Sequence, residues 1–503
     1  MNKRIFIFLF IIGALCLCGC ADDFATKINL DGNSSEGEFN SEAALYGTVQ
    51  DNYGKPIAGV LVSDGMQTTE TDAKGNWQLF SDLKLRRFVF VTIPAGYEVP
   101  SKNGIPQFWQ RIPENEKQFK ADFTLMKRAG SGDRYTILMT ADPQIRAKTA
   151  GTDKYMFHSI DIYEDMCKDM KELAATITDR PVYSICLGDM VHNNMSLWED
   201  YCEGLKDFSF PVFHVIGNHD HIQNAASDDL AVAEYEKYLG PTNYAVDLGQ
   251  VHYIFLDNVE WLCGHLSHVD KNKILMVCGH TSFYKKIGYD PSVSDLNASV
   301  YTGLFSAYKF VHSWAGHNHD YYNYAYAAEE TSPKYPNVES HILGRSTGML
   351  GLNASVTSDG GPRGYLVIDV DGENITWKFK ACGYEEGKKL ENLPADWQLR
   401  AYAPNEQGWY TSGKVYVNVW NYDAHWGPVY YSDSGKTKVA MSKDKTHDGY
   451  ANSLYEQYKD QYTVLAYTTT PHMFSIEPSE GATSATIETT DRFGNRYTAS
   501  VSW

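Results

Sequence analysis

Five short groups of metal-capable side chains stand in the middle of the chain, each directly after an apolar run of strand length. They are Asp142-Pro143-Gln144, Gly188-Asp189, Gly217-Asn218-His219-Asp220, Gly279-His280 and Gly316-His317-Asn318-His319. Carboxylate, amide and imidazole groups are the ligands that proteins use for divalent and transition metals. Each group alone is weak, because Gly-Asp is usually a turn and Gly-His-x-His is often a surface loop. Five in this order favour one shared metal site.

The apolar runs before these groups alternate with helical patterns, which is typical of a sheet built from βαβ units. The expected strands are Tyr135 to Thr140, Val182 to Leu187, Val212 to Ile216, His252 to Leu256, Ile274 to Cys278 and Phe310 to Ala315. Apolar residues recur every three or four positions from Phe157 to Ile177 and predict an amphipathic helix. The carboxyl ends of such strands gather at one rim, where α/β sheets bind ligands.

The order and types of these residues resemble the calcineurin-like metallophosphoesterases, whose series runs Asp-x-His, Gly-Asp, Gly-Asn-His-Asp/Glu, His and Gly-His-x-His. The resemblance covers about residues 134 to 322. The pair of motifs Gly-Asn-His-Asp and Gly-His-x-His makes it specific. It implies an α/β domain that hydrolyses a small phosphorylated substrate with two divalent metal ions, from among manganese, iron, magnesium and zinc. Two such cations make hydroxide from a shared water at neutral pH, and that hydroxide attacks phosphorus in line.

The resemblance also implies which residues hold the metals. One ion is expected on Asp142 and His319, the other on Asn218, His280 and His317, with Asp189 as the bridge. The departure is Gln144, where the family usually has histidine. A glutamine oxygen can still ligate a metal or bond its water, but it is a poorer, harder donor than imidazole. The hypothesis is that this first site is weaker for zinc and prefers manganese, iron or magnesium.

Five further residues near the expected site are considered for other roles. By resemblance, His219 is catalytic rather than a ligand, and it protonates the leaving alkoxide while Asp220 orients its ring. Arg146 is a substrate-binding candidate because a guanidinium matches phosphate bidentately, and a solvated loop arginine is the alternative. His192 fits a supporting or a solvent-facing position equally well. Arg345, near the same rim by sequence logic, receives no role.

The N-terminus predicts export and anchoring. A short basic start precedes the apolar run from Ile5 to Cys18, which is shorter than the roughly 20 residues of a membrane-spanning helix. The run ends in Leu17-Cys18-Gly19-Cys20, which resembles the lipobox of bacterial lipoproteins and implies lipidation at Cys20. We therefore expect a signal peptide over 1–19 and an extracytoplasmic protein anchored to the outer membrane by its lipid. A plain secretory peptide and a lone membrane anchor are the alternatives.

Composition predicts a multidomain chain. Its 503 residues are enough for about three domains. A polar tether over 20–43 precedes short alternating runs over 44–127, which resemble a transthyretin-like β-sandwich. The catalytic α/β sandwich is expected over 128–335, and a C-terminal β-rich domain over 336–503.

Charge and aromatic content bear on partners. The net charge of −19 would repel duplex DNA, so nucleic acid is excluded as a partner, while the oligomeric state is not determined.

The rival interpretation is a non-catalytic lipoprotein that binds glycan or a partner, with a degenerate central domain. The replacement of the usual histidine by Gln144 is the only feature that favours this rival interpretation. Six tryptophans in the last third would suit sugar stacking, although aromatic residues also fill β-sandwich cores.

Overall fold

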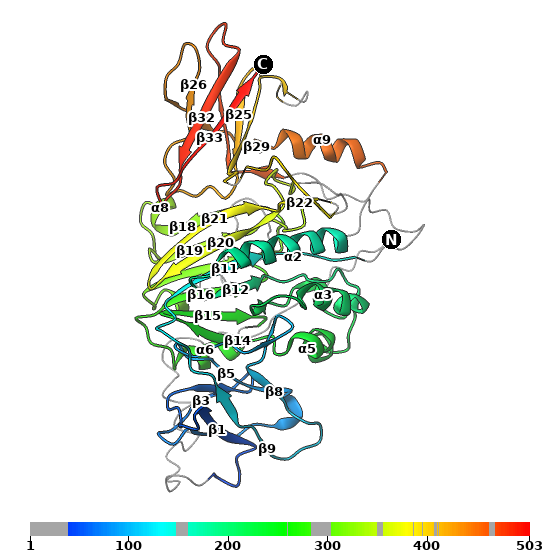
Figure 1. Ribbon diagram of the computed structural model, residues 1–503, viewed down its shortest axis with the longest axis vertical. Coiled ribbons are helices and arrows are strands. Elements are labelled where there is room, and N and C mark those ends of the chain that lie inside the picture. Colours follow the sequence, from blue (N-terminus) through cyan, green and yellow to red (C-terminus); the bar gives the residue numbers. More distant parts are fainter. Residues whose placement is uncertain are drawn as a thin grey trace.

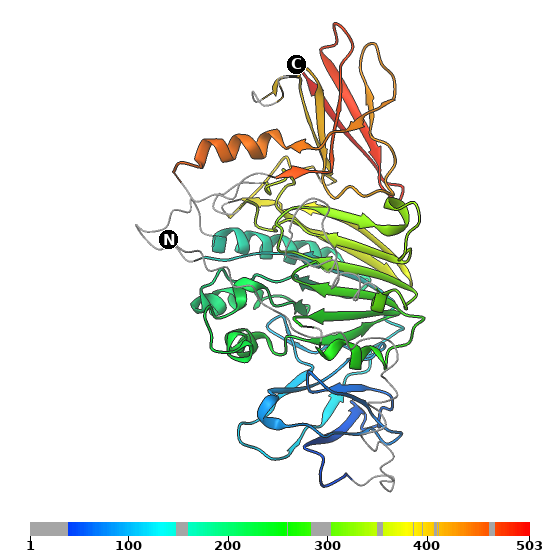
Figure 2. The same cartoon turned by 180° about the vertical axis from the view of Figure 1, so that it is seen from behind.

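The computed structural model describes residues 39–503, except 147–158, 259, 283–302, 350–355, 386, 395, 407–409, 411 and 462–467. Three β-rich units follow one another along its long axis (Figures 1 and 2). The expected signal peptide, Cys20 and most of the tether lie outside the described residues. Within the described part, no helix is long and apolar enough to cross a membrane.

The N-terminal unit consists of two small sheets. Their orders are β10-β1-β4, with β9 beside β1, and β3-β2-β5-β8. The strands are β1 (Leu45–Asp51), β2 (Leu61–Ser63), β3 (Thr68–Glu70), β4 (Asn76–Leu79), β5 (Phe88–Val91), β8 (Trp109–Arg111), β9 (Phe119–Lys120) and β10 (Phe123–Leu125). Arg87 binds Glu236 of the central unit, and Trp261 Nε1 of that unit donates to Ser63 Oγ at 2.9 Å. The expected β-rich domain is therefore present and is fastened to the next one.

The central unit is built on two larger sheets. The first has the order β13-β12-β11-β20-β21 and the second β14-β15-β16-β17-β19-β18. The first sheet comprises β11 (Arg134–Thr140), β12 (Val182–Cys186), β13 (Val212–His214), β20 (Gly364–Asp371) and β21 (Asn374–Ala381). The second comprises β14 (Tyr244–Leu248), β15 (Val251–Leu256), β16 (Ile274–Gly279), β17 (Phe310–Ala315), β18 (Tyr322–Ala325) and β19 (Val338–Ile342). All six strands expected here from the sequence are present within one or two residues.

The first sheet is buried on both faces. Ile137 and Met139 of β11 join the core shared with the second sheet, whereas Leu138 between them packs on the helix side. The covering helices are α2 (Ser159–Thr176), α3 (Trp198–Leu205) and α5 (Ala233–Leu239), and α6 (Glu260–Leu266) lies beside the second sheet. Burial on both faces explains why these strands are nearly continuous apolar runs in the sequence.

The expected boundary between residues 335 and 336 does not separate the sheets. Strand β19 lies beyond it and pairs in parallel with β17, while β20 pairs antiparallel with β11 from Arg134↔Asp371 to Met139↔Leu366. The central sheets therefore extend to the end of β21. Sequence pattern alone cannot show this, because an alternating strand such as β21 fits an edge of either a central or a C-terminal sheet.

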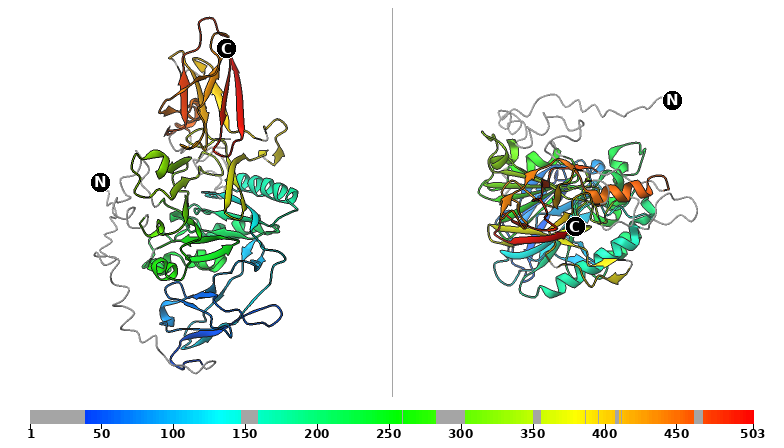
Figure 3. Two further views of the ribbon diagram at one scale, coloured as in Figure 1. Left: turned by 90° about the vertical axis from the view of Figure 1, so that its left-hand side faces the viewer. Right: turned by 90° about the horizontal axis from the view of Figure 1, so that it is seen from above.

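In its described residues, the C-terminal unit contains two four-stranded sheets, the two-stranded sheet of β29 (Thr446–His447) and β30 (Thr469–Thr470), and one helix (Figure 3). Its main elements are β24 (Leu399–Tyr402), β25 (Val415–Val419), β26 (Tyr430–Ser432), β27 (Val439–Ala440), β28 (Ser442–Lys443), α9 (Gly449–Tyr458), β31 (Met473–Ile476), β32 (Ser484–Thr490) and β33 (Arg496–Ser502). Buried Asp359 accepts from the Tyr321 N–H at 2.6 Å and lies 3.2 Å from His472 Nε2. This contact joins the C-terminal unit to the chain two residues after His319.

The tryptophans of the last third mostly fill cores. Trp377 and Trp420 are buried, Trp426 is 9% exposed, and Trp397 packs partly buried on the same core. Trp503 is 37% exposed, and Trp409 lies outside the described residues. An aromatic stacking platform for sugars is therefore not formed by those that are buried.

Candidate metal centre

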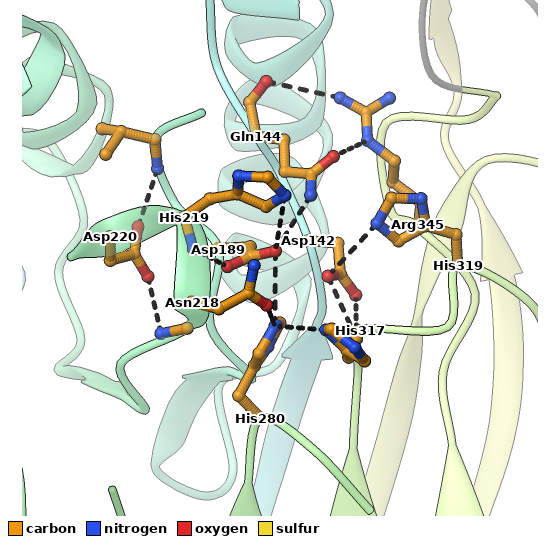
Figure 4. Close-up of polar contacts among 12 residues, drawn as sticks. Asp142, Gln144, Asp189, Asn218, His219, Asp220, His280, His317, His319 and Arg345 are labelled. Atoms are coloured by element: carbon orange, nitrogen blue, oxygen red, sulfur yellow. Dashed lines mark hydrogen bonds and ion pairs between the residues drawn. The ribbon is translucent and has the colours of Figure 1, made fainter. Parts of the chain in front are cut away.

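The predicted ligands converge where the carboxyl ends of both central sheets meet (Figure 4). Two groups of side chains each bring their ligand atoms within 4.8 Å of one another: Asp142, Asp189 and His319 form the first, and Asp189, His280 and His317 form the second. Asp189 is common to both groups. This is the position that a carboxylate bridging two cations requires.

The second group has the spacing of a cation site. His280 Nε2 lies 3.3 Å from Asp189 Oδ2, 3.2 Å from His317 Nδ1 and 3.1 Å from Asn218 Oδ1. Ligand atoms arranged tetrahedrally around an ion, with bonds of about 2.0–2.2 Å, lie about 3.3–3.6 Å apart. His280 Nδ1 lies 2.8 Å from the Leu187 carbonyl oxygen and donates to it. The lone pair of Nε2 is therefore available to a metal.

The first group is more deeply buried. His319 Nε2 lies 3.6 Å from Asp142 Oδ1, and the His317 N–H donates to Asp142 at 2.9 Å. Asp142 is fully buried and Asp189 is 1% exposed. Buried carboxylates so close together need compensating positive charge. In the metal-free protein this positive charge comes from His280. Burial lowers the pKa of His280, but the negative charges of Asp189 and Asp142 outweigh burial and raise that pKa to about 10.

Five residues of the centre share an unfavourable backbone conformation. Asp142, Gln144, Asp189, His317 and His319 all have positive φ, between 44° and 68°. Apart from asparagines and Lys438, these are all the non-glycine residues with positive φ in the described part of the chain. The left-handed conformation is unfavourable for such residues, and it is concentrated at functional sites where the surrounding structure enforces it.

Glycine precedes the site residues because the strand ends approach one another closely. A Cβ at Gly217 would lie 2.2 Å from Asp189 Oδ1, and one at Gly188 would lie 2.5 Å from His280 Nδ1. Gly217 has φ −109° and ψ 170°, an extended conformation that any residue adopts. The requirement at Gly217 is therefore space for the backbone and the carboxylate of Asp189.

Gln144 is in the site, and its side-chain oxygen, expected from the sequence to ligate a metal or bond its water, accepts from Arg345 in this structure. Gln144 Nε2 donates to Asp189 Oδ2 at 2.9 Å, and Gln144 Oε1 accepts from Arg345 Nε at 3.2 Å. A guanidinium only donates, so the oxygen of the amide must face Arg345. Arg345 is 2% exposed and also donates to the Pro143 carbonyl at 3.0 Å. Sequence reasoning left Arg345 without a role, since 201 residues separate it from Gln144.

Asp220 is also placed differently from the expectation. Its carboxylate accepts from the Val191 N–H at 3.0 Å and the Gly217 N–H at 2.8 Å, not from the His219 ring. Asp220 therefore closes the turn η3 (Asn218–Asp220) and positions the backbone that carries Asn218 and His219. Burial raises its pKa well above the usual range.

His219 lies over the centre without belonging to either ligand group. Its backbone N–H donates to Asp189 Oδ1 at 2.8 Å, and its Nε2 is 4.0 Å from Asp189 Oδ2. The ring stacks on His192 with centroids 4.3 Å apart, so the supporting role of the two considered for His192 is the one the structure has. Burial, followed by the nearby His219 and half-buried Arg146, lowers the pKa of His192 to about 3.

We predict that Gly217→Ala weakens metal binding. The added methyl group would lie 2.2 Å from Asp189 Oδ1 and 2.3 Å from the Asp189 backbone N, so the backbone and the shared carboxylate of Asp189 must both shift. Metal content after reconstitution, measured by plasma mass spectrometry, should fall by at least one ion per chain. Gly264→Ala is the control, because a Cβ there meets only the Met66 carbonyl oxygen at 3.8 Å. Equal metal content in both variants contradicts the prediction.

For Gln144→Ala we expect lower stability but the same metal content as the unsubstituted protein. The change removes partners from buried Arg345 and Asp189, which costs about 1–3 kcal/mol of unfolding free energy in urea titration. No ligand oxygen is lost. Gln398→Ala is the control, since buried Gln398 donates to the Phe379 carbonyl away from the centre. Loss of one metal equivalent in Gln144→Ala alone would show that Gln144 does ligate.

Three solved structures illustrate what the chain is similar to. They are the purple acid phosphatase from yellow lupin (Lupinus luteus) seeds (14% identity, TM-score 0.36, covering 66% of this chain and 68% of that chain), a dimetal phosphatase from Danio rerio (12%, 0.32, 49% and 95%) and the 5'-nucleotidase from Candida albicans (10%, 0.29, 49% and 51%). Likenesses this weak carry no conclusion about this chain. No curated protein matches it significantly.

Family profiles match almost the whole described chain. The calcineurin-like phosphoesterase profile matches residues 135–344, the profile for the N terminal of calcineurin-like phosphoesterase matches 43–128, and the profile for the C terminal matches 346–497. These ranges follow the three units of the fold, with the last boundary inside the central sheets. The chain therefore belongs to the calcineurin-like phosphoesterases, as a member that carries the family's N-terminal and C-terminal domains.

Proposed function

We propose that this protein hydrolyses a small phosphate ester with two divalent metal ions, from among manganese, iron, magnesium and zinc. The observation that carries the proposal is the Asp189 carboxylate, which belongs to two ligand groups at once. Asp142, Asp189 and His319 would hold one ion, and Asp189, Asn218, His280 and His317 the other. When bound, such ions supply a hydroxide at neutral pH and neutralise charge on the phosphoryl oxygens.

The residues of the chain perform the rest of the proposed reaction. His219 stands beside the bridging carboxylate and can give a proton to the departing alkoxide oxygen. Its ring is held by the stacking contact with His192, and its backbone by the bond to Asp189. Burial lowers the pKa of His219 in the metal-free protein. The phosphate group of the substrate supplies the negative charge that favours the protonated imidazole.

Arg146 is proposed to bind the substrate phosphate. It follows Gln144 by two residues, and its positive charge acts on His192, which stacks against His219. A guanidinium near that ring pair can pair with a phosphoryl oxygen while His219 faces the leaving group. The remaining specificity, monoester or diester, is left open by the described residues.

We predict that the purified protein with added manganese hydrolyses p-nitrophenyl phosphate or its bis-ester, and that His219→Asn lowers kcat about 100-fold or more. Metal content should stay unchanged, since His219 is in neither ligand group. In the same assay Arg146→Met should raise KM more than it lowers kcat. Release of p-nitrophenol and metal analysis measure these effects.

The matched control for His219→Asn is His268→Asn, a histidine that contacts Glu70 of the N-terminal unit. Its rate should equal that of the unsubstituted protein. The rival interpretation, a degenerate domain in a glycan- or partner-binding lipoprotein, draws on Gln144, whose oxygen faces Arg345 rather than a metal. Hydrolysis that is absent, or indifferent to both chelator and His219, would favour that rival.

We also propose that the enzyme is an extracytoplasmic lipoprotein anchored through Cys20. The support is the sequence Leu17-Cys18-Gly19-Cys20 at the end of a short apolar run, followed by a polar stretch that can act as a tether. Cys20→Ser should leave the protein unlipidated and uncleaved and should abolish palmitate labelling in a Gram-negative host. Cys202→Ser is the control. Undiminished labelling of the Cys20 variant would refute the anchor.

A further inference from the structure

A third group of metal-capable side chains lies between the central and C-terminal units. It consists of His312 on β17 and of Glu339 and His341 on β19, with one ligand atom of each within 4.8 Å of the others. His312 precedes His317 by five residues on an extended strand, so roughly 15 Å of chain separates this group from the two-metal centre. None of the three residues is more than 6% exposed.

The three ligand atoms have the spacing that one small cation imposes. His312 Nδ1 lies 3.3 Å from His341 Nε2, and Glu339 Oε2 lies 3.7 Å from each of these nitrogens. Tetrahedral ligands with bonds of about 2.0–2.2 Å lie about 3.3–3.6 Å apart. A cation between them therefore requires shifts of a few tenths of an ångström and no new rotamer.

The proton of His341 is placed so that its other nitrogen is left for a ligand. His341 Nδ1 lies 2.7 Å from Asn323 Oδ1. Asn323 Nδ2 donates to the side-chain oxygen of Asn421 at 3.1 Å, so Asn323 Oδ1 must be the acceptor. His341 Nδ1 therefore carries the proton, and the lone pair of Nε2 points at His312 and Glu339. A hydrogen bond of this kind is typical of metal-binding histidines.

Aromatic rings hold the two imidazoles in place. His341 stacks on Trp314 with centroids 4.1 Å apart, and Trp377 meets His312 edge to face at 5.4 Å. The pair is thus rigid before any ion binds.

The C-terminal unit completes the surroundings of Glu339. Arg492 donates to both Glu339 oxygens at 2.7 Å and to Asp423 Oδ2 at 3.3 Å. A carboxylate oxygen has two lone pairs, so Oε2 can accept from Arg492 and still face the imidazoles. His425 Nε2 lies 3.4 Å from Glu339 Oε1, and its side chain is 35% exposed. It marks the side from which an ion can enter.

We propose that His312, Glu339 and His341 bind one further divalent transition metal, and that zinc suits this two-histidine, one-carboxylate set best. All three ligands belong to the central unit, and Glu339 is at the same time the partner of Arg492 in the C-terminal unit. The competing interpretation is a metal-free hydrogen bond from His312 Nδ1 to His341 Nε2. This site is independent of the proposed phosphoesterase reaction.

The test separates this site from the two-metal centre by means of Asp189→Asn, which removes the shared ligand there. The full-length Asp189→Asn chain, freed of metal with a chelator and reconstituted with zinc, should retain one tight zinc ion by plasma mass spectrometry. Adding His341→Gln or His312→Gln should reduce this to none. Adding His265→Gln should leave one, because His265 is a buried histidine stacked on Trp261 outside all three groups.

A second measurement follows stability and fluorescence instead of metal content. Zinc should raise the Tm of the Asp189→Asn chain, and Co2+ should quench its tryptophan fluorescence because Trp314 contacts His341. Both effects should disappear with His341→Gln and persist with His265→Gln. Zinc-free Asp189→Asn protein with an unshifted Tm would overturn the proposal, whatever the phosphoesterase assay shows. So would one zinc ion retained after both His312→Gln and His341→Gln.

Discussion

The Asp189 carboxylate is the interaction on which the centre depends. It is almost fully buried, touches both ligand groups, accepts from Gln144 and the His219 backbone, and limits residue 217 to glycine. Burial raises its pKa, but the charge of His280 outweighs burial and holds that pKa well below the usual range. A permanently ionised carboxylate in a dry site is costly unless cations share it. The positive φ angles of Asp142, Gln144, His317 and His319 belong to the backbone that positions these side chains around Asp189.

The two sheets carry different parts of this task. The first sheet, through β11, β12 and β13, supplies the carboxylates and the turn with Asn218 and His219, whereas β16 and β17 of the second sheet supply the imidazoles. The bridging position exists only because both sheets end at the same place. The C-terminal unit touches this frame at several places, among them Asp359 beside Tyr321, Asn421 at Asn323 and Arg492 at Glu339, so its packing can affect the histidines of β17 and the loop after it.

Gln144 illustrates how a ligand position can change its role. With histidine there, the family places an imidazole at the first metal. Here the Gln144 amide bonds to both Arg345 and Asp189. The buried guanidinium of Arg345 is therefore connected to the shared carboxylate through one neutral side chain. The departure is therefore linked to Arg345, and neither residue is interpretable without the other.

The sequence by itself determined the five strand ends, their residue types and the helix α2, because buried parallel strands are apolar runs and the candidate ligands follow them within a few residues. It also predicted β-rich units on both sides. Only the tertiary structure decided that β19, β20 and β21 belong to the central sheets, that Asp220 holds backbone, that Gln144 faces Arg345, and that His312 meets Glu339 and His341. These are contacts between side chains and strands distant in sequence or in register, and no local periodicity encodes which partner a strand edge or a buried polar group will find.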